Sequence, residues 1–273
     1  MALVVGLIYY AIGDTFYIST LDWNGVSPFA EEVGAGNFAK MFADPVFWQS
    51  LTHTAVFFVC TFALQTLIGF TFAAILHTEV KLRTVHKVIV FLPTVLAPAT
   101  MAPTFRLLFS DAGMLNDILR GIGLDKLAHP WLADPNTALP TIMLITVWQW
   151  TGMTFILYYA SMSQIDSDIL EAARLDGAGN FRVLSAIVWP SCRGTTTVMA
   201  ILGFIGALKT FDVPWLVTVG GPNHATEFLG TYIYRQGIRN SHVGYAAAIS
   251  LALLVLAVAG AILMTLNNRR QAK

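Results

Sequence analysis

The chain has 273 residues, of which 56% are hydrophobic and 12% are charged, and its formal net charge at pH 7 is zero. Soluble domains carry charged residues at about a quarter of their positions, so this composition excludes an ordinary soluble domain. A zero net charge also gives no support for a basic nucleic-acid-binding surface, and we expect no nucleic acid partner. Apolar runs of about 20 residues can cross a bilayer, so we predict an all-α membrane protein with the lipid bilayer around it.

Residues 1–20 form the weakest of the predicted spans. The run from Met1 to Gly13 is apolar, but Asp14 interrupts it, and an acidic side chain near the bilayer midplane costs about 3 kcal/mol. We therefore expect Asp14 at the outer end of a first helix that is truncated. No basic start or small-residue cleavage motif indicates a signal peptide.

The second predicted span covers residues 50–77 and the third covers residues 88–110. Three basic residues lie in or next to the connection between them, Lys81, Arg83 and Lys87. This charge predicts a cytoplasmic connection. The third span contains a proline at every fifth position, namely Pro93, Pro98 and Pro103. Such prolines are typical of a broken helix along a transport pathway, and also of a helix that is only kinked for packing.

The remaining apolar segments follow a regular order. An outer loop at residues 111–139 contains a small amphipathic helix at residues 114–120. The fourth, fifth and sixth spans are predicted at residues 140–163, 195–219 and 243–266.

The polar stretch at residues 164–193 carries its own helix signals. Asp168, with a glutamate three residues later, has the spacing of a capping box and predicts a helix start. Gly177 and Gly179 predict its end, because glycine accepts the left-handed conformation that a helix stop needs. A second short amphipathic helix is predicted to follow and to end at Pro190. We interpret the stretch as a helix–turn–helix knob between two spans.

The spacing within this knob is specific. It combines Glu171-Ala172-Ala173, Gly177, Ile187 and Pro190. This resembles the loop signature of the ABC-importer permeases, the membrane subunits of binding-protein-dependent uptake systems, although those permeases usually have leucine at Trp189. A generic capped helix would share the glutamate and alanines without the rest of the register. The resemblance implies that the loop docks on a separate ATPase through Glu171, Ala172, Ala173, Asp176, Gly177, Ile187 and Pro190.

The resemblance covers nearly the whole chain. Outer segments at residues 21–25, 37–48 and 131–135 are similar to those of sugar permeases, and the turn at residues 220–226 resembles that of the first of two paired sugar permeases. It implies six transmembrane helices in a single permease domain, residues 1–273, with the docking loop inside it. It also implies a second homologous permease, two ATPase subunits and an extracytoplasmic solute-binding protein as partners. ATP and Mg would then bind the ATPase subunits, with no cofactor on this chain.

Charge predicts the orientation in the membrane. The segments 77–87, 164–193 and 268–273 carry nine Lys and Arg against five Asp and Glu, whereas the rest carries seven against eleven. Positive charge collects on the cytoplasmic side. We therefore expect a multi-pass protein with both termini in the cytoplasm, and the resemblance implies that the membrane is the bacterial cytoplasmic (inner) membrane.

The sequence lacks the motifs of several enzyme classes, and this narrows the range of possible functions. The sequence has no Gly-x-x-x-x-Gly-Lys-Ser/Thr phosphate loop, no zinc-ligand spacing and no recognisable catalytic arrangement. We therefore expect a transporter subunit that is not itself an enzyme. The ionisable residues of the predicted spans lie near outer ends, namely Asp14, Arg106, Lys209 and Asp212. An ion-coupled carrier usually keeps acids near the midplane, so the pattern favours ATP coupling over that alternative.

Two helix faces are candidates for the solute pathway. On the fourth span the face holds Thr146, Gln149, Trp150 and Met153, and on the fifth it holds Gly203, Gly206, Ala207 and Thr210. Both sets follow the i, i+3, i+4, i+7 spacing of one helix face. The resemblance to maltose-type permeases implies that these positions line a sugar path. Small-residue stripes are equally typical of helix packing in membranes.

A tryptophan beside a glutamine suits a sugar, whose CH face stacks on a ring while its hydroxyls bind amides. The resemblance to sugar permeases, with which this lining agrees, implies import of a sugar or oligosaccharide. A permease for glycerophosphodiesters or polyols remains the alternative within the family.

Overall fold

The computed structural model describes residues 2–77 and 81–271, so Glu79 and Lys273 of the charge count lie outside the described residues. The helices are α1 (Ala2–Ser19), α2 (Gly36–Ala43), α3 (Pro45–His77), α4 (Arg83–Val95), α5 (Pro98–Leu108), α6 (Met114–Gly121), η1 (Asp125–Leu127), α7 (Pro135–Met162), α8 (Ser167–Leu175), α9 (Asn180–Val183), η2 (Leu184–Val188), α10 (Trp189–Ser191), α11 (Arg193–Leu208), α12 (Asp212–Thr218), α13 (Leu229–Tyr234), η3 (Arg235–Arg239) and α14 (Val243–Gln271). The two-residue strands β1 (Leu21–Asp22) and β2 (Glu31–Glu32) pair antiparallel.

The predicted all-α membrane architecture is confirmed. Within the described residues, α3, α7 and α14 are long and apolar enough to cross a membrane, and two bent helix pairs raise the number of candidate spans to five. The pairs are α4 with α5, and the segment from α9 to α10 with α11. Helix α1 is a shorter apolar helix that lies along α14. These six apolar segments match the six spans predicted from the sequence.

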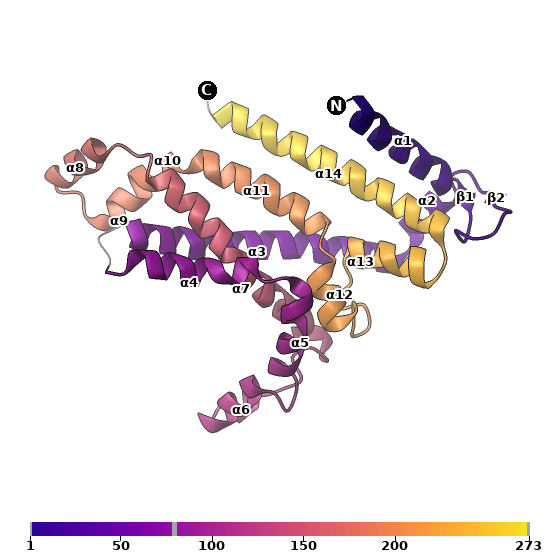
Figure 1. The fold of residues 1–273 in the computed structure, drawn as a ribbon, viewed down its shortest axis with the longest axis horizontal. Helices are drawn as coiled ribbons and strands as arrows, with labels where there is room; N and C mark the ends of the chain where they lie inside the picture. The colour runs from indigo at the N-terminus through magenta and orange to yellow at the C-terminus, as the bar shows by residue number, and fades with distance from the viewer. Residues whose placement is uncertain (1, 78–80, 272–273) are drawn as a thin grey trace.

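The third predicted span is broken rather than kinked. Helices α4 and α5 meet at 95°, and Ala97 between them has an extended backbone. Pro98 explains the break, because it disfavours helical geometry at the residue before it and is tolerated at the first position of the next helix. Helices α5 and α6 consequently project away from the long helices (Figure 1).

The prediction that the fifth span reaches residue 219 is wrong. Helix α11 ends at Leu208, and α12 is a separate short helix after the polar residues Lys209 and Thr210. Pro214 has no N–H with which to continue α11, whereas it fits the first turn of α12. The result is a second interruption, next to α5.

Close helix packing places α7 between α3 and α4. A Cβ atom at Gly69 of α3 would lie 2.7 Å from Cγ2 of Thr154 on α7. A Cβ atom at Gly152 of α7 would lie 2.5 Å from the carbonyl oxygen of Val90 on α4. Small residues of this kind let helix backbones approach closely in membranes. Helix α7 is therefore held on two sides, and it leads directly towards α8 at one end of the molecule (Figure 1).

At the opposite end of the molecule, one carboxylate and two tyrosine hydroxyls connect the start of α3 to α13 and α14. Asp44, just before α3, accepts hydrogen bonds from the hydroxyls of Tyr232 on α13 and Tyr245 on α14. Burial acts to raise the pKa of Asp44, but these bonds and those from backbone N–H groups outweigh it, so the pKa is lowered. Burial and the hydrogen bond to Asp44 raise the pKa of Tyr232 to about 12. The cluster joins the start of α3 to two later helices.

Candidate functional site: an interior cleft and an exposed helical knob

A cleft of about 440 Å³ lies between α3, α7, α11 and the start of α12. All eight residues predicted to line a solute path border this single cleft: Thr146, Gln149, Trp150, Met153, Gly203, Gly206, Ala207 and Thr210. The faces predicted on two separate spans therefore meet around one space.

Gln149 connects the cleft to the break between α4 and α5. Its side chain is 1% exposed, and its Nε2 donates a hydrogen bond to the carbonyl of Leu96, 3.0 Å away. The hydroxyl of Thr94 on α4 donates a hydrogen bond to the backbone carbonyl oxygen of Gln149, 2.9 Å away. A carbonyl freed by a broken helix needs such a partner inside a membrane. Gln149 therefore stabilises the interruption as well as bordering the cleft.

The other residues of the α7 face are more accessible than Gln149. Trp150 is 45% exposed and Met153 is 42% exposed. The hydroxyl of Thr146 bonds back to the carbonyl of Ile142 in the preceding turn. The cleft thus offers an accessible indole ring next to an amide.

The α11 face serves two purposes. A Cβ atom at Gly203 would be 3.6 Å from the ring of Phe58 on α3, and Ala207 is 3% exposed, so both positions belong to helix packing. A Cβ atom at Gly206 would meet no heavy atom within 4 Å. Gly206 therefore borders open space and gives the cleft room. The two interpretations of the small-residue stripe apply to different members of it.

Sequence reasoning missed the contribution of α3. This helix lines the cleft with Phe57, Thr61, Phe62, Gln65 and Thr66. The side-chain Nε2 of Gln65 donates a hydrogen bond to the carbonyl of Thr146, 3.3 Å away. Thr61 and Gln65 are one helical turn apart in an otherwise apolar span, and that spacing was the available signal.

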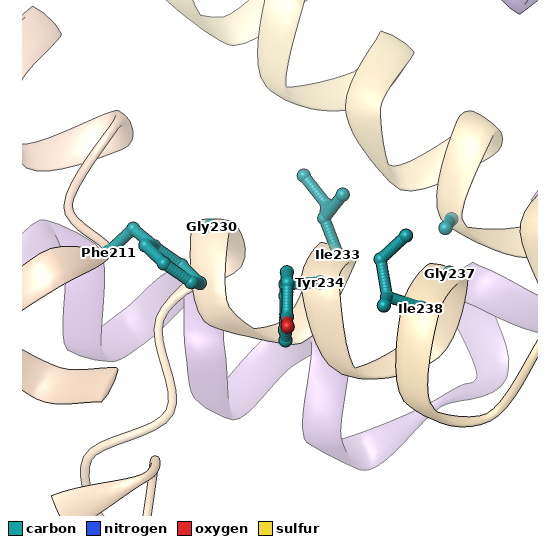
Figure 2. A pocket seen from close by; sticks show the side chains of 7 residues that line it. Phe211, Gly230, Ile233, Tyr234, Gly237 and Ile238 are labelled. Atoms are coloured by element: carbon teal, nitrogen blue, oxygen red, sulfur yellow. The ribbon is translucent and has the colours of Figure 1, made fainter. Parts of the chain in front are cut away.

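The mouth of the cleft is formed at the interruption between α11 and α12. Lys209, Phe211 and Asp212 line it there. Phe211 also borders a second, apolar depression of about 360 Å³ (Figure 2). That depression is further lined by Gly230, Ile233, Tyr234, Gly237, Ile238 and Ala246. The ring of Phe211 is therefore shared by both spaces.

The knob at residues 164–193 begins differently from the prediction. The residue that caps α8 is Asp166, whose carboxylate accepts the backbone N–H of Asp168 at 3.0 Å. The predicted capping box, in which Asp168 caps the helix, is therefore wrong. Asp166 lies two residues earlier and has the extended backbone of a capping residue.

Of the two glycines predicted to end α8, only Gly177 does so. Gly177 has φ +80°, and the N–H groups of Gly177 and Ala178 bond to the carbonyls of Arg174 and Ala173. This is the hydrogen-bond pattern of a left-handed helix stop. Gly179 does not end α8 but precedes α9 as its cap. Pro190 does not end the second helix either, since the helix continues to Ser191 through a position that proline tolerates.

One side of the knob packs on the molecule and the other is exposed. Leu170, Ala173, Ala178 and Leu184 contact a buried cluster that includes Tyr158 and Met162. The most exposed large apolar residues of the knob are Leu175 at 89% and Phe181 at 84%. Of the seven predicted docking residues, the exposed ones are Glu171, Ala172, Asp176 and Gly177, and the half-buried ones are Ala173, Ile187 and Pro190.

The exposed face also carries unneutralised charge. Among the described residues, no basic side chain lies within 4.0 Å of the Glu171 carboxylate. An exposed apolar surface next to an available carboxylate is typical of a protein interface.

Comparison with known proteins identifies the family. Residues 65–273 match the model of the binding-protein-dependent transport system inner membrane component. The chain belongs to this family. It is therefore an inner-membrane permease subunit of an ABC transporter, in which ATP hydrolysis takes place on a separate chain.

Curated relatives match along most of their length. The probable ABC transporter permease protein YurN of Bacillus subtilis is 32% identical over 255 residues, 92% of this chain and 87% of YurN. The lactose transport system permease protein LacF of Rhizobium radiobacter is 31% identical, over 82% of this chain and 76% of LacF. The diacetylchitobiose uptake system permease protein NgcF of Streptomyces coelicolor is 29% identical, over 98% of this chain and 80% of NgcF.

Solved structures share the fold. A chain of a bacterial ABC transporter involved in the import of the acidic polysaccharide alginate has a TM-score of 0.85 at 20% identity, covering 100% of this chain and 94% of that chain. A second structure of an alginate transporter, in complex with an alginate pentasaccharide-bound periplasmic protein, gives 0.84 at 20% identity with the same coverage.

The open space beside Gly206 leads to a prediction about a larger side chain at this position. A phenylalanine at position 206 would project into open space without striking the fold, so Gly206→Phe is expected to reach the membrane at the wild-type level. Because the phenyl ring would occupy space that the solute needs, we expect solute uptake to fall about tenfold or more, which corresponds to about 1.4 kcal/mol. Val198→Phe is the control, since Val198 lies on the same helix, is 53% exposed and does not line the cleft. Equal uptake by the two variants would contradict a path through the cleft.

Proposed function

We propose that this permease imports a sugar or oligosaccharide through the cleft between α3, α7 and α11. The observation that carries the proposal is the convergence of eight positions, predicted from two separate spans, on one space. The names of LacF and NgcF, which describe uptake of lactose and diacetylchitobiose, support a saccharide as the solute.

The chemistry of the lining agrees with this solute class. The indole of Trp150 gives an apolar face for the CH groups of a sugar ring. The hydroxyls of Thr61, Thr146 and Thr210 donate to backbone carbonyls one turn earlier and provide neutral acceptor oxygens. The amide of Gln65 provides a neutral donor and an acceptor. Lys209 and Asp212 add one charge of each sign at the mouth. A neutral, hydroxyl-rich solute matches such a lining.

We further propose that the exposed side of the knob docks on an ATPase subunit. Leu175 and Phe181 supply an apolar tip, and Glu171 supplies a carboxylate for a basic residue on the partner. The half-buried Ala173, Ile187 and Pro190 keep the knob seated on its own subunit. The complete importer then contains a second, homologous permease, two ATPase subunits that bind ATP and Mg, and a solute-binding protein on the outer side.

The arrangement suggests how movement of the ATPase subunits is transmitted to the cleft. Helix α7 carries four of the cleft positions and ends at Met162, shortly before α8 begins at Ser167. Closure of the ATPase subunits would move the knob, and α7 would carry that movement to the cleft. In this arrangement the knob and both termini face the cytoplasm, and α12 faces the binding protein.

Charge reversal on the knob tests the docking role. We expect Glu171→Lys to lower uptake at least about tenfold with normal membrane insertion, because an unpaired or repelled charge at an interface costs about 2 kcal/mol or more. Glu31→Lys makes the same change on an exposed residue of β2 at the other end of the molecule and should leave uptake unchanged. Wild-type uptake in Glu171→Lys would rule out this docking residue.

The solute class is tested with the assembled importer. The permease is co-purified with its ATPase, partner permease and binding protein, and ATP hydrolysis is measured in proteoliposomes with a panel of di- and trisaccharides, polyols and glycerophosphodiesters. Stimulation by a saccharide that Gly206→Phe abolishes is the expected result. Stimulation by glycerophosphodiesters or polyols alone would overturn the proposal.

A further inference from the structure

A buried ion pair lies behind the outer mouth of the cleft. The side chain of Glu227 is 0% exposed, and its Oε2 accepts a hydrogen bond from Nε of Arg235 at 2.8 Å. The Nδ1 of His224 lies 3.0 Å from the same oxygen. A ring nitrogen of His53 on α3 lies 3.0 Å from the Glu227 backbone carbonyl oxygen. Glu227 is thus fixed to α3, a helix that lines the cleft.

Arg235 connects this fixed carboxylate to α12. Its Nη2 donates a hydrogen bond to the carbonyl of Val219, 2.6 Å away, at the end of α12. Its guanidinium also lies over the ring of Trp215 on α12, 5.6 Å from the ring centroid. Trp215 in turn stacks with Phe211, with ring centroids 5.7 Å apart. Phe211 is the residue shared by the cleft and the depression in Figure 2.

One atom of the ion pair lacks a partner. Within the described residues, Oε1 of Glu227 is buried and accepts no hydrogen bond. An arginine and a carboxylate normally prefer a bidentate pair, with Nε and Nη2 each bound to one oxygen. Here Nη2 is directed to Val219 instead, and a buried acceptor without a donor is unfavourable.

The two candidate partners of Nη2 are close together. A Cβ atom at Gly220 would lie 2.7 Å from Nη2 of Arg235 and 3.0 Å from Oε1 of Glu227. Nη2 and Oε1 therefore border the same space beside Gly220, and a bidentate pair would form across it. Gly220 has φ +78°, and its missing side chain leaves the space in which Nη2 would turn.

We propose that Glu227 and Arg235 are positioning residues that form a two-position latch on α12, and this rests on the cleft being the solute path. In the position seen here, Nη2 holds the end of α12 and keeps Phe211 at the mouth. In the other position, Nη2 pairs with Oε1 and no longer holds the carbonyl of Val219. Helix α12 then keeps the buried contacts of Val213 and Val217 and the hydrogen bond between Thr218 and Thr226, but it loses its tie to Nη2 of Arg235. The hydrogen bond lost at Val219 is replaced by one at Oε1, so the number of hydrogen bonds made by Nη2 is the same in both positions. The apolar depression beside Phe211, lined by Gly230 and Gly237, gives its ring a place to move.

The number of acceptor oxygens at position 227 tests the latch. Glu227→Asp keeps two acceptors and removes a methylene, whereas Glu227→Gln keeps the size and leaves one acceptor. For a latch we expect uptake by Glu227→Asp within about threefold of wild type and uptake by Glu227→Gln at least about tenfold lower, through the maximal rate with an unchanged KM for the loaded binding protein. Uptake by Glu227→Gln equal to or above that of Glu227→Asp would overturn the proposal.

Arg235→Lys with Arg239→Lys provides the matched pair. A lysine ammonium cannot bind Glu227 and Val219 in the forked geometry of arginine. Arg239 also lies over Trp215, at 5.1 Å, and within the described residues it forms no ion pair. We expect uptake about tenfold lower for Arg235→Lys and unchanged for Arg239→Lys. Equal uptake by the two variants would contradict the latch.

Hydrogen exchange tests the latch independently of which solute is transported. In the assembled wild-type importer, amides of residues 212–219 are expected to exchange faster in one of the two states, ATP-free or vanadate-trapped, and in Arg235→Lys they should exchange fast in both. Identical protection of this segment in both states of the wild type would overturn the latch. Absence of saccharide uptake by the wild type would instead contradict the proposed function, and the exchange result would still decide the latch.

Discussion

Helix α7 is held between two neighbouring helices at positions where their backbones meet. Gly69 of α3 leaves room for Thr154, and Gly152 of α7 leaves room for the backbone of α4. Association of helices in lipid depends on such close packing, because lipid chains are as apolar as the side chains they replace. With α7 fixed in this way, the cleft at its middle and the knob beyond its end acquire a constant relation to each other. The proposed transport path and the proposed docking surface both depend on that relation.

The space for a solute comes from interrupted helices. Two of the apolar segments do not continue straight, at the junctions of α4 with α5 and of α11 with α12, and the cleft lies beside both junctions. Interrupted backbone inside a membrane needs internal hydrogen-bond partners. Gln149 supplies one for the first interruption, and Gly230 lets the start of α13 approach the backbone of Thr210 at the second. The elements that open the cleft are therefore stabilised by residues next to it.

Local sequence signals predicted much of this arrangement, and long-range contacts account for what they missed. Apolar length indicated the six segments, and Gly177 indicated the end of α8, because each signal acts within a few residues. The break before Pro98 could not be told from a kink, since the difference depends on Gln149 from a distant helix. The spacing of Asp168 and Glu171 predicted the wrong cap, because the true cap, Asp166, is the same residue type two positions earlier. The ion pair of Glu227 with Arg235 spans only eight residues, but it was missed because no regular helix or strand spacing brings these two residues together. The docking and pathway roles remain predictions.

The most direct measurement is the distance between the two ends of α7 in the working importer. Spin labels at position 136, at the exposed start of α7, and at position 163, the exposed residue directly after its end, are compared in the ATP-free and vanadate-trapped states. A helix that transmits motion as one body predicts a distance that is constant to within about 2 Å, as in small shifts of packed helices. A change of about one helical turn, roughly 5 Å, would show that α7 bends or unwinds, and would contradict the account.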